Sequence, residues 1–262
     1  MSSSGLKTQT FQIMTNDNKQ QKPSDSTDTA IAYSTCCVSG AVSKDGISLI
    51  HGDSLQALRG YGDNHFDWAI VDPPYGIEDK ISIGGGSHTK TKTKFHNLYT
   101  ENGKKWDIRP PKEYFIELQR VSKNQIVCGG NYFTEFLPVS RGWAYWHKQG
   151  EKMSSVNDEL IWTSLDISIK MFSRCHGLDK GFMNKEGKNI HPTQKPIQLY
   201  KWLLENYTSE GDLILDTHLG SGSIAIACHY MKRKLVGYEI DAEYYEKACK
   251  RFEEQTRQIA LW

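Results

Sequence analysis

From about residue 45 onward, short apolar runs alternate with segments of helical periodicity. Apolar runs bounded by turn residues are typical of buried strands, and apolar positions three or four apart are typical of helices. The alternation predicts an α/β domain with a doubly wound sheet, whose ligands bind at the carboxyl ends of its strands. The segments expected to form strands are 47–50, 66–71, 125–128, 142–147, 159–163, 212–215 and 234–240.

The composition divides the chain into a polar start and one folded domain. Residues 1–30 are rich in Ser, Thr, Asn, Gln, Asp and Lys. Such a stretch cannot bury enough apolar surface to offset its ordering entropy, so we expect a disordered tail. Residues 45–262 are expected to form the domain, with a long loop at 77–110, where periodicity is absent, and a short polar insert at 175–190.

Charge, cysteines and hydropathy exclude several classes of protein. The formal net charge of +1 is too small for a general nucleic-acid coat protein, so any contact with nucleic acid must come from local basic patches. The six cysteines form no CxxC pair and have no zinc-ligand spacing, so we expect reduced thiols, no metal site and a cytoplasmic location. Neither a membrane span nor a signal peptide is expected.

The sequence Asp72-Pro73-Pro74-Tyr75 directly follows an apolar run, which places it at the ligand edge of the predicted sheet. An aromatic amine is a poor nucleophile, because its lone pair is shared with the ring. Acceptors on its two N–H groups would draw the lone pair out of conjugation, and the Asp72 carboxylate and the Pro73 carbonyl can supply them. Tyr75 offers a flat face on which a base can stack. The alternative interpretation is a proline-rich turn after a strand.

A glycine-containing turn follows the apolar run at 213–215, in the sequence Asp216-Thr217-His218-Leu219-Gly220-Ser221-Gly222. Glycines allow the backbone to approach a ligand closely at the start of the next helix. The full dinucleotide fingerprint is not present, and a tight strand–helix turn is the alternative. Glu239 ends the next strand about 20 residues on, where an acidic side chain can accept both ribose hydroxyls.

Two further residues are candidates for cofactor contacts. Asp53, after the first predicted strand, could receive the amino group of an adenine, or it could cap the helix that starts at Ser54. Lys195, in the sequence HPTQKP at 191–196, could meet a cofactor carboxylate, or it could be a solvated lysine in a rigid turn.

Together these motifs resemble the beta group of amino-methylating DNA methyltransferases, in which the order of motifs is circularly permuted. In that group DPPY precedes the glycine motif, as 72–75 precedes 216–222 here, and HPTQKP lies just before the glycine strand. The resemblance covers roughly 47–256. It implies a mixed, Rossmann-like sheet of seven strands, S-adenosylmethionine as cofactor and base flipping.

By this resemblance, Asp72, Pro73, Pro74 and Tyr75 are the catalytic residues. The residues expected around the cofactor are Asp53, Lys195, Asp216, Gly220, Ser221, Gly222 and Glu239. The chain departs from the family in having Thr217-His218 where Pro-Phe is usual, which puts the packing of the cofactor there in doubt.

The predicted partner is double-stranded DNA. A homodimer and a cognate restriction enzyme are the other partners considered, and the sequence does not decide on either of them. Lys90, Lys92 and Lys94 lie in the long loop with interleaved His and Tyr residues, so they could contact phosphates. The alternative is a solvated flexible loop, and the insert at 175–190 is the second candidate for DNA contact.

The rival functions differ in substrate. Asp72 favours N6 of adenine over N4 of cytosine, because cytosine enzymes of the group more often have Ser there. An RNA adenine methyltransferase has the same order of motifs. A protein glutamine methyltransferase usually has Asn in place of Asp72. The intact Asp72 and Tyr75 also argue against a binding module without catalytic activity.

Overall fold

The computed structural model describes residues 40–76, 107–148, 158–173, 190–191 and 193–257. Three predictions fall largely or wholly outside them: the disordered tail at 1–30, most of the loop at 77–110 and nearly all of the insert at 175–190. The three lysines Lys90, Lys92 and Lys94 also lie outside the described residues. The described residues all belong to one structural unit, 34–262.

Within the described part of the chain, nine strands form a single mixed sheet in the order β1-β2-β9-β8-β3-β4-β6-β5-β7. The strands from β2 to β4 in this order run parallel, and the β1–β2, β4–β6 and β6–β5 pairs are antiparallel. Their bounds are β1 Gly40–Lys44, β2 Ile47–His51, β3 Phe66–Val71, β4 Ser122–Cys128, β5 Trp143–His147, β6 Glu159–Thr163, β7 Lys170–Ser173, β8 Leu213–Asp216 and β9 Lys234–Glu239.

The mixed, doubly wound sheet predicted from the sequence is confirmed, but it has nine strands instead of seven. All seven expected strands are present, and β1 and β7 are additional. Both additional strands lie at the edges of the sheet, where β1 pairs only with β2 and β7 only with β5 among the described residues. Edge strands are partly exposed, so they need no apolar run of the kind that marks a buried strand.

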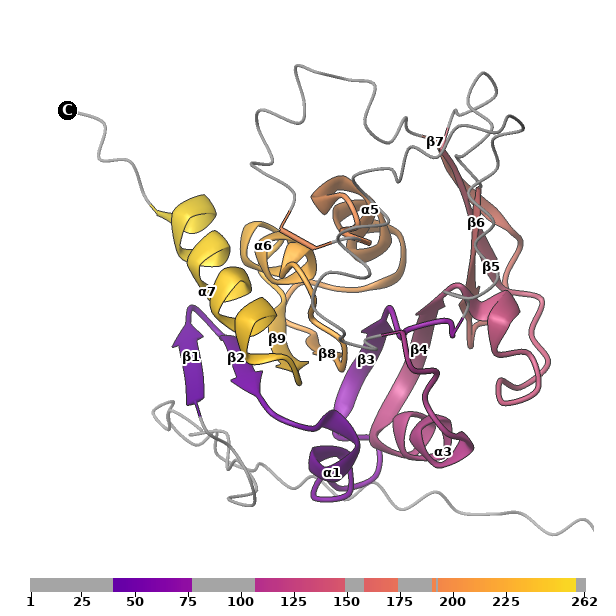
Figure 1. The fold of residues 1–262 in the computed structure, drawn as a ribbon. Coiled ribbons are helices and arrows are strands. Elements are labelled where there is room, and N and C mark those ends of the chain that lie inside the picture. The colour runs from indigo at the N-terminus through magenta and orange to yellow at the C-terminus, as the bar shows by residue number, and fades with distance from the viewer. Residues whose placement is uncertain (1–39, 77–106, 149–157, 174–189, 192, 258–262) are drawn as a thin grey trace, which may run out of the picture. The chain divides into compact units, whose positions relative to one another are not determined.

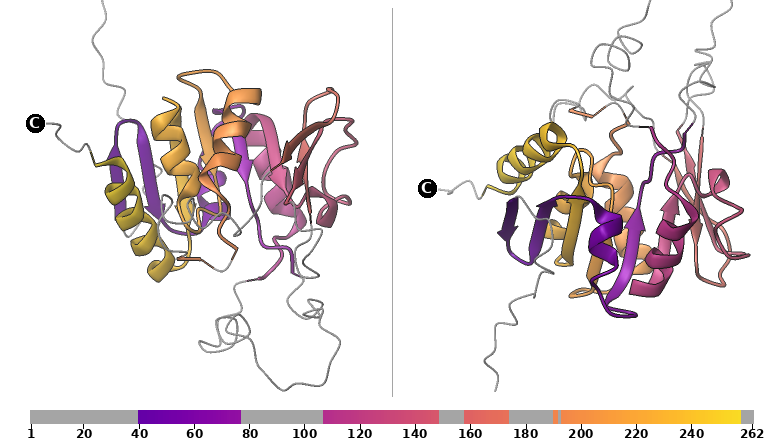
Figure 2. Two further views of the ribbon diagram at one scale, coloured as in Figure 1. Left: turned by 90° about the horizontal axis from the view of Figure 1, so that it is seen from above. Right: turned by 60° about the horizontal axis from the view of Figure 1, so that its bottom comes forward.

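Helices cover both faces of the sheet (Figure 1). The helices α5, α6 and α7 lie on one face, and α1 and α3 lie on the other, as the two further views also show (Figure 2). Their bounds are α1 Ser54–Leu58, α3 Lys112–Val121, α5 Ile197–Tyr207, α6 Ser223–Tyr230 and α7 Ala242–Thr256, and a short 3-10 helix, η2, spans Gly130–Tyr132. Asp241 caps α7 by accepting hydrogen bonds from Glu243 N and Tyr244 N.

The order of the strands creates a switch point between β3 and β8. From β3 the chain continues through α3 to β4 on one side, and from β8 it continues through α6 to β9 on the other. In doubly wound sheets, ligands bind outside the carboxyl ends of the strands at such a point. The DPPY sequence follows β3 and the glycine turn follows β8, so the two predicted motifs meet there.

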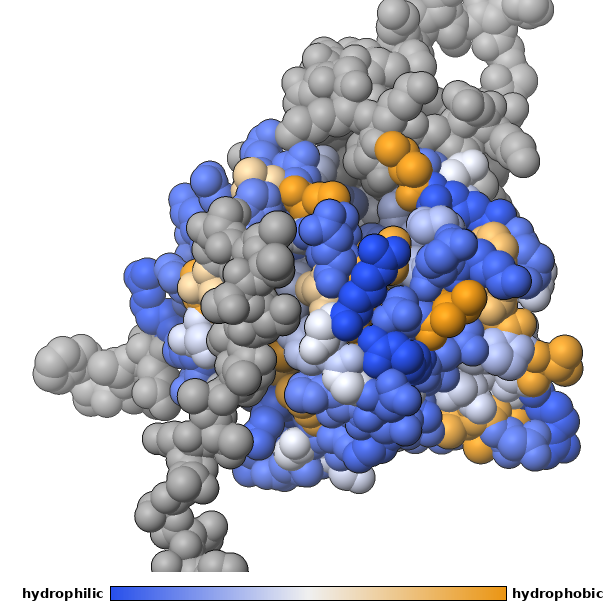
Figure 3. Space-filling model, turned by 90° about the horizontal axis from the view of Figure 1, so that it is seen from below, coloured by the Kyte–Doolittle hydropathy of each residue, from blue (hydrophilic) through white to orange (hydrophobic). Residues whose placement is uncertain are grey.

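The face of the molecule drawn in Figure 3 is mainly hydrophilic, with hydrophobic residues in separate small groups. None of the described helices is long and apolar enough to cross a membrane.

Candidate functional site

The DPPY residues leave the end of β3 in extended backbone and turn at Gly76. Pro73 is buried, whereas Asp72, Pro74 and Tyr75 are partly exposed at the carboxyl edge of the sheet. Gly76 has a positive φ of 69° and donates a backbone hydrogen bond of 2.9 Å to Asp107 Oδ1. This bond joins the two described residues between which the predicted DNA-contacting lysines lie in the sequence.

Lys195 lies directly against Asp72. Its Nζ atom is 2.7 Å from both Asp72 Oδ1 and Asp72 Oδ2, although 123 residues separate the two positions. The side chains of Lys195 and Asp72 are only 7% and 14% exposed, so the pair is shielded from water. The HPTQKP segment therefore contacts the DPPY residues through Lys195; Pro192 of this segment is not among the described residues.

Glu159, at the start of β6, is a second buried carboxylate in the site, and the sequence analysis did not single it out. Its Oε1 atom accepts a hydrogen bond of 3.1 Å from the Tyr75 hydroxyl, and that hydroxyl is also 3.0 Å from Asp72 Oδ1. Lys195 Nζ is 3.3 Å from Glu159 Oε1, and Lys148 Nζ is 3.1 Å from Glu159 Oε2. We call Asp72, Tyr75, Lys148, Glu159 and Lys195 the charge cluster.

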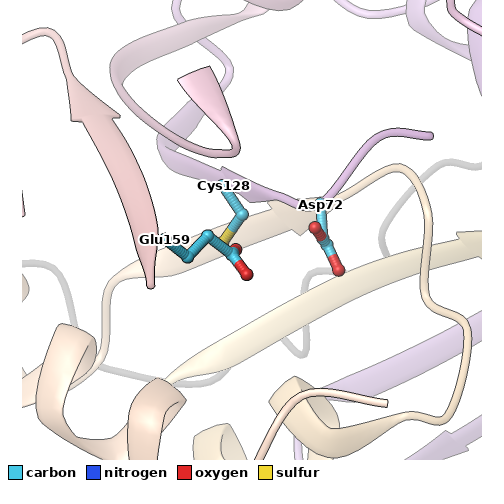
Figure 4. Close-up of side chains that lie close together, drawn as sticks. All are labelled: Asp72, Cys128 and Glu159. Atoms are coloured by element: carbon cyan, nitrogen blue, oxygen red, sulfur yellow. The ribbon is translucent and has the colours of Figure 1, made fainter. Parts of the chain in front are cut away.

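Cys128, at the end of β4, lies beside the two carboxylates of the charge cluster (Figure 4). One potential metal-ligand atom from each of Asp72, Cys128 and Glu159 lies within 4.8 Å of the others. The ammonium group of Lys195 contacts both carboxylates and so supplies a positive charge among these groups. The closeness of the two carboxylates is therefore explained by their ion pairs with Lys195.

Burial and opposite charge act against each other on the ionisable groups of the cluster. Burial raises the pKa of Asp72 above its usual value, although Lys195 acts in the opposite direction. Burial alone would lower the pKa of Lys195, but the charges of Asp72 and Glu159 outweigh it and the pKa is raised. Burial would raise the pKa of Glu159, but Lys195 and Lys148 together lower it. Lys195 therefore stays protonated and Glu159 stays ionised at neutral pH.

The ring of Tyr75 is held by close packing. Tyr132 stacks on it with a centroid distance of 4.7 Å and an interplanar angle of 17°. Gly129 has a positive φ of 62°, and a Cβ atom built on it would lie 2.4 Å from the Tyr75 ring. Only glycine allows this approach. Tyr132 is 38% exposed, so the aromatic pair extends to the surface of the described structure.

The glycine turn, residues 219–222, lies beside Glu239 at the ends of β8 and β9. Gly220 and Gly222 have φ angles of 53° and 71°. The Glu239 carboxylate accepts a hydrogen bond from Gly220 N at 2.8 Å and another from Asp241 N at 2.9 Å. A carboxylate has about four acceptor sites, so this group keeps capacity for a hydroxyl donor. Burial raises the pKa of Glu239.

The departure from the family motif at Thr217-His218 is accommodated by hydrogen bonds. Thr217 Oγ1 is 2.6 Å from the Tyr114 hydroxyl and 2.9 Å from His218 Nδ1, and His218 N donates to Asp216 Oδ1. Burial raises the pKa of Asp216 to about 8 and lowers the pKa of His218 to about 4.

The remaining predicted cofactor residues lie at the same edge. Asp53 caps α1 by accepting hydrogen bonds from Leu55 N and Gln56 N, which is the structural alternative that we considered. Gly52 N donates to Glu239 O, so Asp53 follows directly after a residue bonded to Glu239. Ser221 is buried in the glycine turn.

The two sides of the site are joined through the backbone of Lys195. Ser223 Oγ, at the start of α6, donates a hydrogen bond of 2.7 Å to Lys195 O. The position of the lysine that contacts Asp72 is therefore tied to the helix that follows the glycine turn.

The chain is similar in sequence to several known proteins. A family model described as DNA methylase, covering the N6 and N4 amino-methyltransferases, matches residues 89–250. The Type II methyltransferase M.HpaI of Haemophilus parainfluenzae is 24% identical over 245 residues, which cover 79% of this chain and 74% of that protein. The Type II methyltransferase M2.MboI of Moraxella bovis is 24% identical over 244 residues, which cover 80% of this chain and 88% of that protein.

Among solved structures, the PvuII DNA methyltransferase, described as cytosine-N4-specific, superposes with a TM-score of 0.50 at 14% identity. The match covers 80% of this chain and 90% of that one. At this level of identity the similarity concerns the fold.

Proposed function

This chain belongs to the N6/N4 DNA methylase family, and we propose that it transfers a methyl group to N6 of adenine at a specific site in double-stranded DNA. The cofactor is S-adenosylmethionine, the donor expected for this family. The observation that carries the proposal is the position of the Asp72 carboxylate, at the switch point of the sheet and paired with Lys195. Residues 45–262 then constitute the catalytic domain, as the sequence analysis predicted.

The residues at the glycine turn fit a cofactor with a ribose and a charged tail. Glu239 offers a buried carboxylate that can accept hydroxyl donors, and a Cβ atom on Gly220 would lie in van der Waals contact with the His191 ring at 3.8 Å. We propose that Glu239 binds the ribose hydroxyls, that Asp53 contacts the adenine, and that Asp216, Gly220, Ser221 and Gly222 line the rest of the pocket. When bound, S-adenosylmethionine supplies an electrophilic methyl group.

Asp72 and Pro73 act on the target amine in this proposal. The Asp72 carboxylate and the Pro73 carbonyl each accept an N–H of the flipped base, and the nitrogen lone pair is then directed at the methyl group. Lys195 donates to both Asp72 oxygens and favours the ionised carboxylate, which is the form that accepts. A carboxylate has about four acceptor sites, so Asp72 can bind Lys195 and the amine together.

Lys195 was expected to meet the cofactor carboxylate, and its contact with Asp72 adds a second role to that prediction. Because its backbone carbonyl is bonded to the start of α6, the side chain lies between the pocket at the glycine turn and the DPPY residues. The contact with the cofactor stays a prediction.

Identification of the methylated nucleoside tests the proposed base. The purified chain is incubated with labelled S-adenosylmethionine and either duplex DNA or RNA, and the digested nucleosides are analysed by mass spectrometry. We expect N6-methyladenine in DNA. N4-methylcytosine in DNA, or N6-methyladenine in RNA only, would replace the proposal by one of the two alternatives, and no transfer to any nucleic acid would refute it.

We propose that Lys90, Lys92 and Lys94 contact DNA phosphates. Replacing all three by Ala should weaken DNA binding and reduce the slope of log affinity against log salt by about 0.9 for each lost phosphate contact. The affinity for S-adenosylmethionine should not change. If the triple variant binds DNA with the same salt slope as the parent, the loop is only a connector. Residues 175–190 would then be the favoured DNA contact.

The proposed partners beyond DNA are a second copy of the chain and a cognate restriction enzyme. M.HpaI and M2.MboI are named as Type II methyltransferases, which favours the second of these. Both partners stay predictions.

A further inference from the structure

The proposed reaction uses one carboxylate, Asp72, but the site contains two. The Glu159 side chain is 10% exposed, and a buried charge is costly unless it is paired and hydrogen-bonded. Glu159 interacts with three groups, namely Tyr75, Lys148 and Lys195, at distances of 3.1 to 3.3 Å. All three partners belong to the site, so this carboxylate is tied to the residues around the reacting position.

The charges alternate along the cluster. Asp72 contacts Lys195, Lys195 contacts Glu159, and Glu159 contacts Lys148, whose ammonium lies 4.4 Å from the centroid of the Trp146 ring. Two carboxylates face two ammonium groups, so the ionised cluster has no net charge. Glu159 is thus the acceptor that draws part of the Lys195 charge away from Asp72.

Lys195 has fewer N–H donors than there are acceptors around it, so it matters how these donors are shared between Asp72 and Glu159. An ammonium group has three N–H donors, and four acceptor atoms lie within reach: both Asp72 oxygens, Glu159 Oε1 and the Tyr75 oxygen. Without Glu159, all three donors would turn toward Asp72 and Tyr75. The target amine would then compete with Lys195 for the Asp72 oxygens, and the Tyr75 hydroxyl would lose one of its acceptors.

We propose that Glu159 is a positioning residue for methyl transfer, which shares Lys195 with Asp72 and holds the Tyr75 hydroxyl, so that Asp72 keeps acceptor capacity for the target amine. The role rests on the proposed function, because it concerns the same transfer. It assigns β6, the strand antiparallel to β4, a direct part in building the site.

The proposal implies a change in pH dependence when the charge of Glu159 is removed. The negative charge of Glu159 raises the pKa of Asp72, and the positive charge of Lys195 lowers it. Loss of Glu159 removes the first effect and leaves Lys195 entirely to Asp72, so both changes lower the pKa of Asp72. Other titratable groups from the surrounding elements face Asp72 and Glu159. They are Lys148, Lys195, Tyr75, Cys128, Tyr114, Tyr200 and Asp216.

The test compares Glu159→Gln with Asp158→Asn. Asp158 precedes Glu159, but its carboxylate contacts Tyr145, His147 and the backbone N of Lys148 instead of the charged side chains of the cluster, so it is a matched control. We expect Glu159→Gln to lower kcat about tenfold, to leave the calorimetric affinity for S-adenosylmethionine within about threefold, and to move the acid limb of kcat/KM to lower pH. Asp158→Asn should keep the parental acid limb.

A Glu159→Gln variant with the parental kcat and acid limb would overturn the positioning role, whereas an unmutated chain without methyl transfer would refute the proposed function itself. Glu159→Asp provides a second measurement if the Gln variant does not fold. It keeps the negative charge, so the acid limb should stay in place, but the shorter side chain cannot reach both Lys195 and Tyr75 and kcat should fall. Parental kcat in Glu159→Asp would also overturn the proposal.

Discussion

On the β3 side of the site, charged side chains from separate segments of the chain meet, and their contacts run from side chain to side chain. Asp72 and Tyr75 follow β3, Lys148 follows β5, Glu159 begins β6 and Lys195 precedes α5. On the β8 side, one continuous β8–α6–β9 unit supplies the glycine turn and Glu239, and the contacts run from backbone N–H groups to a carboxylate. The first side depends on charge balance between distant segments, and the second depends on local turn geometry.

This comparison predicts that substitutions on the β3 side lower the rate of transfer and that substitutions on the β8 side lower the affinity for the cofactor. If substitutions on either side changed the rate of transfer and the affinity for the cofactor to the same extent, the two regions would act as one unit.

The largest effect is expected for Asp72→Ala, which should abolish detectable transfer. Removal of a single positioned polar group from an active site typically costs roughly 100- to 1000-fold in kcat, and here the lost group is also the acceptor for the amine. Single-turnover measurements test the rate, and calorimetry should show S-adenosylmethionine affinity within a few fold of the parent.

Asp72→Asn is the control for volume, because it fills the same space but lacks the charge, and it should be inactive as well. Turnover in either variant would remove Asp72 from the catalytic residues and weaken the distinction between the two sides.

A smaller loss is expected for Glu239→Ala, on the other side of the comparison. Loss of a hydrogen bond to a charged group costs roughly 1.5 to 3 kcal/mol, which is about tenfold to a hundredfold in cofactor affinity. Affinity for DNA should be unchanged. Glu243→Ala is the matched control, since Glu243 lies in the first turn of α7 and forms an exposed ion pair with Lys247. Unchanged cofactor affinity in Glu239→Ala would exclude Glu239 from the pocket.

A change in the support of Tyr75 should reduce the rate by about tenfold. In Gly129→Ala the new methyl group would lie 2.4 Å from the Tyr75 ring, so the ring must move, and the backbone keeps an unfavourable positive φ. A displaced ring of this kind costs rate because the reacting groups lose alignment. Gly62→Ala is the control, because, its chain neighbours apart, no described residue lies within 4 Å of the added Cβ atom. Equal kcat for the two variants would show that the position of Tyr75 does not limit the reaction.

The last prediction concerns stability instead of activity and involves Asp216, whose pKa burial raises to about 8 from its usual value of 3.8. Between these two values the folded state retains a proton that the unfolded state has released, so the free energy of unfolding should decrease as pH rises through this window. Asp216→Asn removes this contribution. Urea unfolding at pH 5.5 and pH 8.5 should therefore show a smaller decrease in the variant.

His191 and His218 have pKa values lowered to about 4, so they make the free energy of unfolding increase with pH between pH 4 and 6.5. Both proteins contain these histidines, so the difference in pH dependence between the parent and the Asn variant reports Asp216 alone. Identical pH dependence in the two proteins would mean that Asp216 is ionised in the folded state at neutral pH.

The sequence by itself determined those parts of the site that depend on short-range signals. Asp72 to Tyr75 follow an apolar run directly, and the glycines precede a helical segment, so the position of each motif at a strand end could be predicted. Glu239 was found by its spacing from the glycine turn. Apolar periodicity and turn residues report the local conformation of the backbone, which is why all seven expected strands are present and why the cap that Asp53 forms on α1 could be named as an alternative.

Only the tertiary structure decided which distant segments meet. Glu159 was missed because β6 runs antiparallel to β4, which brings the start of β6 to the edge where the parallel strands end. Lys195 contacts Asp72 across 123 residues because the segment before α5 is bonded to the start of α6. The direction and order of strands depend on long-range pairing and on the burial of whole faces, and no local pattern in the sequence carries that information.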